Sequence, residues 1–424
     1  MSSKSDKKKP LVPSLRFPEF REAGAWEVKR LGDIASIIQD KVGRKECILL
    51  SVTSGIGLVS QVEKFGREIA SNQRKNYFAI RSNDFAYNKS ATKNYPQGFI
   101  GLYKGDKLAG VPNSIFICFR PNLDEVVPSY LDYLFSANLH GKQLNRFITV
   151  GARAHGSLNV DNKDLLSIPI PIPMNDEENG QVEQQKIAHC LSSLDEVMGL
   201  QAKKVQALKQ HKKGLMQQLF PAEGETTPRL RFPEFREAGA WEVKRLGEVC
   251  DSFSGGTPTT TKKQYYGGSI PFIRSAEIAD EITELFLTDE GVKASSAKIV
   301  SKGDVLVALY GANSGDVALS KISGAINQAI LCLRLSVSNE FIYHYLTHKK
   351  GLIIATYIQG GQGNLSGEIV CSISIGFPDN EEQQKIAHCL SSLDEVIGLE
   401  SHKLDALKNL KKGLMQQLFP QDVA

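Results

Sequence analysis

The chain has 424 residues, which is long enough for two or three domains with separate hydrophobic cores. Its 41% hydrophobic and 23% charged residues are typical of a folded globular protein and exclude a disordered or fibrous one. The 51 Lys and Arg residues outnumber the 47 Asp and Glu residues by four, an excess that permits nucleic-acid binding without indicating it.

The first 14 residues are basic, and no apolar run follows the lysines. We therefore expect a disordered tail and not an export signal. No stretch of about 18 uncharged apolar residues occurs in the rest of the chain, so no membrane segment is expected. The seven cysteines form no C-x-x-C pair, which indicates reduced thiols and a cytoplasmic location.

An internal repeat divides the chain into two halves. Three segments recur without a change: LRFPEFREAGAWEVKRLG at 15–32 and 230–247, EQQKIAHCLSSLDEV at 183–197 and 382–396, and KKGLMQQLFP at 212–221 and 411–420. Each half therefore has a constant beginning, a divergent middle and a constant end. Segments that stay identical within one chain satisfy the same constraint twice, whereas the middles can satisfy two different ones.

The divergent middles follow one plan. Each contains apolar runs in the same order and ends in alternating apolar residues, at 167–170 and 372–375, as in a half-buried strand. We therefore predict an α+β domain in each half. The predicted organisation is a basic tail (1–14), a first α+β domain (15–180), a first long helix (181–221), a linker (222–229), a second α+β domain (230–379), a second long helix (380–420) and a tail (421–424).

The repeated ends predict two long helices. Apolar residues recur at heptad spacing in both: Ile187, Leu191, Leu194, Met198, Val205, Leu208, Leu215 and Leu219, and Ile386, Leu390, Leu393, Ile397, Leu404, Leu407, Leu414 and Leu418. A helix from Glu183 to Leu219 would be about 55 Å long, which is more than one small domain can cover. The predicted fold class is thus α+β, with two α+β domains related by pseudo-twofold symmetry and separated by a long antiparallel pair of coiled-coil-like helices.

Polar residues interrupt the apolar stripe at two positions in each helix, Gln201 and Lys212 in the first and Glu400 and Lys411 in the second. In an antiparallel pair, Lys212 should lie beside 393–395. Lys411 should lie beside 194–196. We expect ion pairs between the helices there, which would fix their register. The residues expected to set helix packing and register are Leu191, Leu194, Leu208, Lys212, Leu390, Leu393, Leu407 and Lys411.

Beyond the repeats, the second half contains GGTP at 255–258, SIPFIRSAEI at 269–278, GANSGDVALSKISGAINQA at 311–329 and EEQQKIAHCLSSLDEV at 381–396. With LRFPEFREAGAWEVKRLG, these segments resemble the specificity subunits of Type I restriction-modification systems, over essentially the whole chain. The resemblance implies that each α+β domain is a target-recognition domain. Each would read one half of a bipartite, asymmetric DNA site, and the helices would set the gap.

The resemblance also implies partners. Two modification subunits, which are adenine methyltransferases carrying S-adenosylmethionine, would dock on the repeated helical regions. Restriction subunits with ATP and Mg would join them in phage defence. The chain itself contains no G-x-x-x-x-G-K-[ST] phosphate loop and no Asn/Asp-Pro-Pro-aromatic motif. We therefore expect no catalytic residue, no cofactor and no metal site in this chain.

Loops in the two middles contain side chains of the kinds that read base edges or neutralise phosphates of double-stranded DNA. The candidates for base contacts are Asn88, Lys93, Arg153, His155, Tyr310, Asn313, Gln359, Gln362 and Asn364. The candidates for phosphate contacts are Arg74, Lys75, Lys262, Lys263 and Arg274.

Two other classes of protein remain as alternatives. A self-sufficient fusion of methyltransferase and nuclease would need the missing motifs, and more residues than two recognition domains and two helices leave. A coiled-coil scaffold or adaptor that binds no DNA would explain the helices, but not why the middles diverge on one plan.

Overall fold

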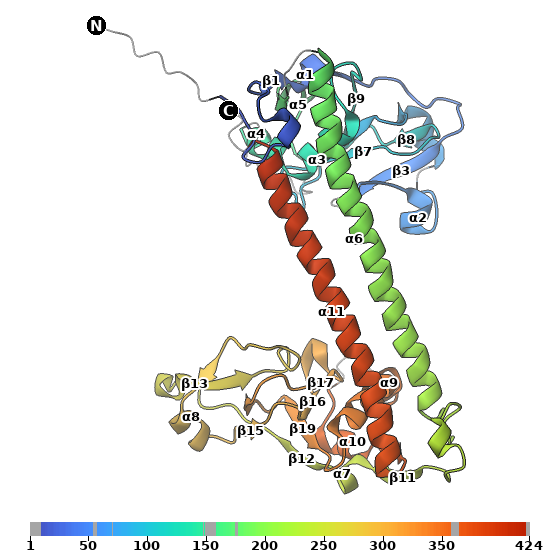
Figure 1. Ribbon diagram of the computed structural model, residues 1–424, viewed down its shortest axis with the longest axis vertical. Coiled ribbons are helices and arrows are strands. Elements are labelled where there is room, and N and C mark those ends of the chain that lie inside the picture. Colours follow the sequence, from blue (N-terminus) through green and yellow to red (C-terminus); the bar gives the residue numbers. More distant parts are fainter. Residues whose placement is uncertain are drawn as a thin grey trace. The chain divides into compact units, whose positions relative to one another are not determined.

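The computed structural model describes residues 10–53, 57–69, 71–146, 148, 158–173, 177–357 and 364–420. The chain forms two compact units. Unit 1 is built from residues up to Leu200 and from Leu404 onward, and unit 2 is built from Gln201–Lys403. Each unit combines one α+β domain with parts of both long helices, α6 (Glu177–Leu219) and α11 (Asn380–Leu418) (Figure 1).

Unit 1 contains three small sheets. They are the antiparallel pair β1 (Glu27–Arg30) and β10 (Pro169–Ile172), the sheet β2 (Ala35–Ile37), β9 (Phe116–Pro121), β6 (Phe85–Asn88) and β7 (Phe99–Leu102), and the sheet β4 (Gly57–Ser60), β3 (Ile48–Thr53), β8 (Ala109–Val111) and β5 (Phe78–Ile80). Neighbouring strands in this order are hydrogen-bonded to each other. Only β3 and β8 pair in parallel among these described strands.

Unit 2 repeats this topology. Its sheets are the pair β11 (Glu242–Arg245) and β20 (Ser374–Phe377), the sheet β12 (Asp251–Ser254), β19 (Ile330–Arg334), β16 (Val305–Ala308) and β17 (Val317–Leu319), and the sheet β14 (Phe286–Leu287), β13 (Tyr266–Ile273), β18 (Gly324–Ile326) and β15 (Lys298–Val300). Strands β13 and β18 are parallel, like β3 and β8. The divergent middles therefore share one fold.

Short helices connect these sheets. Unit 1 has α1 (Leu31–Ile34), α2 (Gln61–Phe65), α3 (Pro128–Ser136), α4 (Leu139–Leu144), α5 (Asn162–Leu166) and the 3₁₀ turns η1 (Pro18–Phe20) and η2 (Ser71–Asn76). Unit 2 has α7 (Leu246–Val249), α8 (Asp289–Lys293), α9 (Asn339–Tyr357), α10 (Gly367–Ser372) and the turns η3 (Pro233–Phe235), η4 (Lys263–Tyr265) and η5 (Gly311–Asn313).

Each α+β domain has an aromatic core that the end of a long helix completes. In unit 1, Phe419 at the end of α11 packs edge-on against Tyr130, with ring centroids 5.6 Å apart. In unit 2, Phe220 at the end of α6 packs against Tyr345 at 5.2 Å. Both phenylalanines are almost completely buried. Burial of a large aromatic side chain contributes strongly to stability, so each domain depends on a helix end for its core.

A buried ion pair joins the constant beginning of each half to the start of its long helix. In unit 1, Arg16 donates two hydrogen bonds to Glu183, at 2.8 and 2.7 Å. In unit 2, Arg231 binds Glu382 in the same way, at 2.8 and 2.5 Å. Each arginine also donates to two backbone carbonyls. We call this pair the Arg–Glu clamp. Because its polar groups are paired, the buried charges are tolerated.

The constant beginning of each half is hydrogen-bonded to the end of a long helix in the same unit. The amide of Leu15 donates to the carbonyl of Gln417 at 3.0 Å, and the amide of Leu230 donates to Gln218 at 2.9 Å. Likewise, Trp26 donates to Leu11 and Trp241 to Thr226, each at 2.7 Å. The described residues nearest to the two ends of the chain are therefore neighbours.

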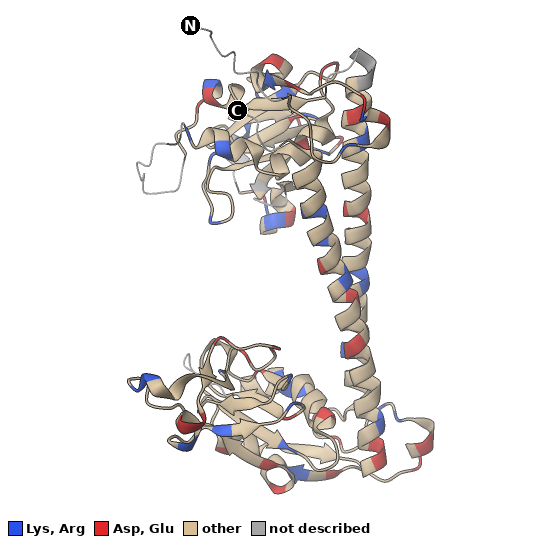
Figure 2. Cartoon of the chain, turned by 60° about the vertical axis from the view of Figure 1, so that its left-hand side comes forward, with Lys and Arg blue, Asp and Glu red and all other residues tan. Residues whose placement is uncertain are grey.

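The two long helices are antiparallel. In unit 2, Gln201 of α6 contacts Glu400 of α11, and Lys212, further along α6, contacts Asp394, which is earlier in α11. The predicted fold class is thus confirmed, although α6 begins at Glu177 and not at 181. Within the described ranges, no helix is both long and apolar enough to cross a lipid bilayer. Figure 2 shows that charged residues of both signs are interspersed along the helices.

Candidate nucleic-acid interface

In unit 1, a hairpin loop between β6 and β7 carries several candidate DNA contacts. The side chain of Asn88 accepts a hydrogen bond from the amide of Ser90 at 2.9 Å, which shapes the exit from β6. The loop returns at Gly98, whose φ of 82° is left-handed. A Cβ there would lie 2.5 Å from the carbonyl oxygen of Asn88, so only glycine fits this close approach.

Unit 2 has a tighter loop at the equivalent place, between β16 and β17. The hydroxyl of Ser314 donates to the carbonyl of Leu309 at 2.9 Å. Gly315 has a φ of 84°, and its amide donates to the carbonyl of Ala308 at 2.8 Å. This framework holds Tyr310, which is 40% exposed, and Asn313, which is half-buried.

A backbone hydrogen bond joins each hairpin loop to the segment before the domain's last helix and strand. In unit 1, the amide of Leu158 donates to the carbonyl of Lys89 at 2.7 Å. In unit 2, the amide of Leu365 donates to the carbonyl of Leu309 at 2.8 Å. Both acceptors directly follow the hairpin's first strand. The structure therefore ties the end of each late candidate loop to the hairpin loop of the same unit.

The candidates for base contacts fall into three groups. Lys93, Tyr310 and Asn364 are exposed, as base contacts require, and Asn313 is half-buried. Arg153, His155, Gln359 and Gln362 lie outside the described residues, and their role stays a prediction. Asn88 is only 8% exposed, and its side-chain oxygen accepts the hydrogen bond that shapes the hairpin. Its contact with bases stays a prediction.

The phosphate candidates lie on two 3₁₀ turns and one loop. Lys75 of η2, Lys263 of η4 and Lys262 beside it are exposed, whereas Arg74 is half-buried. Arg274 differs, because its guanidinium binds Glu277 and Glu284 at 2.8 and 2.6 Å. The Arg274 guanidinium lowers the pKa of Glu277 to about 2. Arg274 is therefore better explained as an anchor of this loop than as a phosphate contact.

A bidentate ion pair lies at the start of each hairpin. It was not predicted from the sequence. Asp84 binds Arg120 in unit 1 through two bonds of 2.7 Å, and Asp304 binds Arg334 in unit 2 through bonds of 2.9 and 2.6 Å. Each Asp directly precedes the hairpin's first strand. The shared Asp in Asn83-Asp84-Phe85 and Gly303-Asp304-Val305 was the available signal, but nothing in the sequence identified its partner.

The structure contains both ion pairs predicted between the helices. The Lys212 ammonium lies 2.5 Å from a carboxylate oxygen of Asp394, and Lys411 lies 2.6 Å from Asp195. Lys212 is buried, and Lys411 is mostly covered. The other two seam-breaking residues pair with each other, because Gln201 donates to the Glu400 carboxylate at 2.6 Å. That these contacts fix the register stays a prediction.

The leucines predicted at the helix seam differ in burial. Leu191 in unit 1 and Leu390 in unit 2 are completely buried. The other four are partly covered: Leu194, Leu208, Leu393 and Leu407. Val205 and Ile397 in unit 2 are also buried, so the seam is closed at these positions too.

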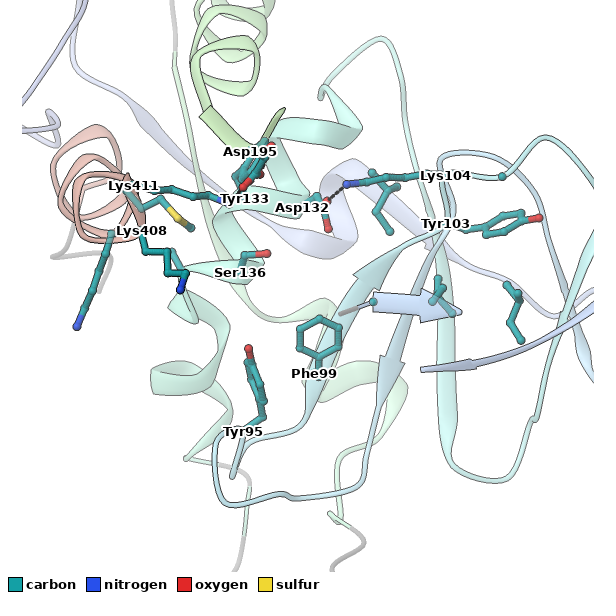
Figure 3. A pocket seen from close by; sticks show the side chains of 18 of the residues that line it. Tyr95, Phe99, Tyr103, Lys104, Asp132, Tyr133, Ser136, Asp195, Lys408 and Lys411 are labelled. Carbon is teal, nitrogen blue, oxygen red and sulfur yellow. Dashed lines mark hydrogen bonds and ion pairs between the residues drawn. The ribbon is translucent and has the colours of Figure 1, made fainter. Parts of the chain in front are cut away.

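A groove of about 960 Å³ runs between α11 and the sheets of unit 1 (Figure 3). Tyr95 of the hairpin loop and Phe99 of β7 form one side, and Lys408, Lys411 and Lys412 of α11 line the other. Lys104 also lines the groove, but it pairs with Asp132 at 2.8 Å. The Lys104 side chain is largely exposed, and exposed ion pairs are weak, so Lys104 can exchange partners.

No group of three or more His, Cys, Asp and Glu side chains in the described residues could hold a metal ion. What the site offers is a rigid framework with variable polar loops, which is suited to recognition.

Comparisons with known proteins agree with this picture. The family model described as the Type I restriction modification DNA specificity domain matches residues 24–210 and 239–409. A putative type I restriction enzyme specificity subunit of Methanocaldococcus jannaschii is 25% identical over 93% of this chain and 92% of its own length. The EcoR124I/EcoR124II specificity subunit of Escherichia coli is 25% identical over 55% of this chain and 57% of its own.

The fold is also similar to solved structures. A crystal structure of the S subunit of a Type I restriction-modification system from M. genitalium has a TM-score of 0.60 and 16% identity, covering 97% of this chain and 99% of its own. A chain in a structure of an assembled type I restriction-modification system has a TM-score of 0.56 and 19% identity, covering 93% and 97%. These similarities concern the fold.

Proposed function

The chain belongs to the family of Type I restriction-modification DNA specificity proteins, and we propose that it selects DNA sites for subunits that carry out the chemistry. The observation that carries this proposal is the repetition of one framework with different loops. Units 1 and 2 share strand order and ion pairs, yet their hairpin loops differ in length and sequence. Two readers on one framework suit a bipartite, asymmetric site.

Each unit would read one half of the site. Side chains of the hairpin and late loops would contact base edges, and lysines near η2, η4 and the groove beside α11 would contact phosphates. Phosphate contacts would position the DNA without selecting its sequence. The alternative of a scaffold that binds no DNA gains no support from the family match.

Two modification subunits would dock on the repeated regions. Exposed apolar side chains occur there at identical positions of the two halves, for example Leu200 and Leu399, which are 60% and 64% exposed. Val197 and Val396 lie one helical turn earlier, and both are also exposed. Large exposed apolar residues at equivalent positions of the two halves are suited to binding two copies of the same partner. S-adenosylmethionine, ATP and Mg would bind the partner subunits, in the cytoplasm, and this chain would be non-catalytic.

The long helices would set the gap between the half-sites. The 43 residues of α6 and the 39 residues of α11 correspond to lengths of about 65 and 59 Å, which limits the gap to about 17 to 19 base steps of 3.4 Å. Inserting one heptad into both helices should lengthen the gap without altering either half-site. An unchanged gap would mean that another part of the complex sets the spacing.

Mapping methylated adenines tests the proposal. The full chain would be expressed with a modification subunit from the same source, in cells without other adenine methyltransferases. We expect methylation at one bipartite sequence, and none when either protein is produced alone. Methylation by this chain alone, or a complex that methylates adenines without a bipartite site, would contradict the proposal. A stable, active complex with only one modification subunit would contradict the docking on both repeats.

A further inference from the structure

A second hollow, of about 750 Å³, opens in unit 1 beside the junction of the hairpin and late loops. Its floor is formed by the ends of β2 and β9, including Ile37, Phe116 and Cys118. Polar side chains form its rim: Gln39, Lys89, Asn113, Asn159, Asp161, Asn162, Lys163 and Asp164. None of the amide residues on this rim was a candidate in the sequence analysis.

Backbone hydrogen bonds fix the segments that carry the rim. The amide of Ile38 donates to Cys118 at 2.8 Å, and the amide of Lys89 donates to Ile115 at 3.0 Å. The bond from Leu158 to Lys89 completes the frame. Gln39, Asn113 and Asn159 each lie within two residues of one of these bonded positions. Side chains on such a frame are held in place before a ligand arrives.

The amides of Gln39, Asn113 and Asn159 are exposed and make no hydrogen bond to any described residue. Other amides of unit 1 serve the fold, as Asn122 does by accepting a bond from the amide of Asp124. An exposed side-chain amide with a free donor and a free acceptor can form the bidentate contact that recognises the adenine edge in the major groove.

The charges of the rim favour bases over phosphates. Lys89 and Lys163 are balanced by Asp161 and Asp164, whose side chains accept each other's backbone amides at the start of α5, at 2.8 and 3.1 Å. The hollow therefore has no excess of positive charge to attract the DNA backbone. The groove beside α11 is lined by four lysines, Lys104, Lys408, Lys411 and Lys412, and by three carboxylates, Glu63, Asp132 and Asp195, so its lining has one net positive charge and is the better phosphate site of the two.

We propose that this hollow reads base edges in the half-site bound by unit 1, with Gln39 and Asn113 as specificity-determining residues that select adenine. This inference rests on the proposed function, and it names residues that the function alone does not assign. Asn159, at the start of the segment leading to α5, completes the rim and contacts the same stretch of bases.

Among the described residues of unit 2, the amide at the position equivalent to Asn113 is not free. Cys118 and Cys332 occupy the same place in the sheets, each opposite the second residue of the hairpin's first strand. Five residues before them stand Asn113 and Asn327. The Asn327 side chain accepts a hydrogen bond from the amide of Ala329 at 3.1 Å and so serves the fold. The two units should therefore read different bases, which makes the second half-site an internal control.

The test is to map methylated adenines with the full chain and its modification subunit, comparing Gln39→Ala, Asn113→Ala and Asn113→Asp with the original chain. Gln206→Ala, which removes an exposed amide from α6, is the matched control. We expect each alanine variant to reduce base preference about ten-fold at one position of one half-site. Asn113→Asp should shift the preference there from adenine toward cytosine, since a carboxylate accepts from the cytosine amino group.

The second half-site and the gap should not change in any variant, and Gln206→Ala should leave the whole site as it is. Unchanged preference in both halves, or altered preference in both, would overturn the inference. Loss of methylation with a lowered melting temperature would show that the amides serve the fold, which also overturns it. If the original chain directs no bipartite methylation, the proposed function fails, and this inference fails with it.

Discussion

Units 1 and 2 share the ion pairs that hold the fold together and differ at their surfaces. The Arg–Glu clamp, the Asp–Arg pair under the hairpin and the Lys–Asp pair between the helices occur in both. The differences lie in the hairpin loops, in the free amides of unit 1, and in α9, whose 19 residues replace the nine of α3 followed by α4. Contacts that hold the fold are thus separate from those that can select a ligand.

The same Lys–Asp pair has different neighbours in the two units. Tyr133 donates to Asp195 at 2.8 Å in unit 1, and the residue after it is the buried Leu134. In unit 2, the residue after Tyr343 is the buried His344, whose ring contacts Ser391 at 3.1 Å and lies 3.9 Å from Asp394. The Lys–Asp pair that both units share therefore has a titratable neighbour, His344, in unit 2.

The largest expected effect is a loss of stability when the Arg–Glu clamp is broken, and it tests whether the clamps of the two units are equivalent. Arg16→Ala and Arg231→Ala should each destabilise its unit by about 3 to 5 kcal/mol, because each leaves a buried carboxylate without its partner. The chain has two tryptophans, Trp26 in unit 1 and Trp241 in unit 2, so replacing one with Phe leaves the other to report urea unfolding of a single unit. Arg21→Ala, at an exposed position, is the control. Effects that differ by more than about 2 kcal/mol would show that the clamps are not equivalent.

Substitutions in the loops should differ from those in the clamps, because their effects should be confined to one half-site. Arg153→Ala and Gln362→Ala should each cost about 1 to 3 kcal/mol of DNA binding and relax specificity in one half, because a base contact has no counterpart in the other unit. Binding of the assembled complex to duplexes that vary in one half-site measures this. Altered preference in both halves, or in neither, would mean that these residues do not read bases.

Unit 2 should respond to mild acid through His344. Burial, and secondarily the charge of Lys212, lowers the pKa of His344 to about 3, so the folded unit keeps the ring neutral. Stability from this group is complete above the unfolded pKa of about 6.5 and falls as pH decreases toward 3. Between pH 7 and pH 5, His344→Leu should therefore remove about 2 kcal/mol of the stability loss in unit 2.

Two other buried histidines also titrate in acid, so the contribution of His344 has to be separated from theirs. The pKa of His140 in unit 1 and that of His348 in unit 2 are each lowered to about 4 by burial, so both units retain some sensitivity to acid. Urea unfolding followed through Trp241 at both pH values isolates the contribution of His344. An equal loss of stability in His344→Leu and the original chain would show that the ring does not titrate in this range.

The smallest effect is expected for a circular permutation. Because Leu15 and Gln417 meet as Leu230 and Gln218 do, joining the ends and reopening the chain at 222–227 should change stability by less than about 1 kcal/mol. The specificity should not change. Reopening within α9, which belongs to a core, is a control that should abolish folding. A permuted chain that unfolds at the 222–227 break would show that the linker holds unit 2 together.

Much of the architecture follows from the repeat and the heptad pattern, because both are local signals. They predicted two α+β domains, two antiparallel helices and the partners of Lys212 and Lys411. The clamp could not be predicted, since Arg16 and Glu183 are 167 residues apart and no periodicity links them. The turn-shaping role of Asn88 could not be predicted either, because a polar residue beside a loop is suited both to contacting DNA and to shaping the turn.

The free amides of unit 1 were missed for a related reason. Gln39, Asn113 and Asn159 come from three separate segments, and only the bonds among Ile38, Cys118, Lys89, Ile115 and Leu158 bring them around one hollow. Sequence reasoning concentrated on glycine-rich loops, where exposure can be recognised. Exposure at strand ends depends on tertiary packing, which the sequence does not display.

The Arg–Glu clamp and the strand pair beside it also determine how a recognition domain could be exchanged. Both partners of each clamp lie in constant segments, on either side of the divergent middle. The middle leaves β1 and returns as β10, so its two ends meet in register, from Glu27 opposite Ile172 to Arg30 opposite Pro169. Each divergent middle is thus inserted between two neighbouring points of constant structure. A middle of another length or sequence would contact the same Arg–Glu clamp and the same helix end.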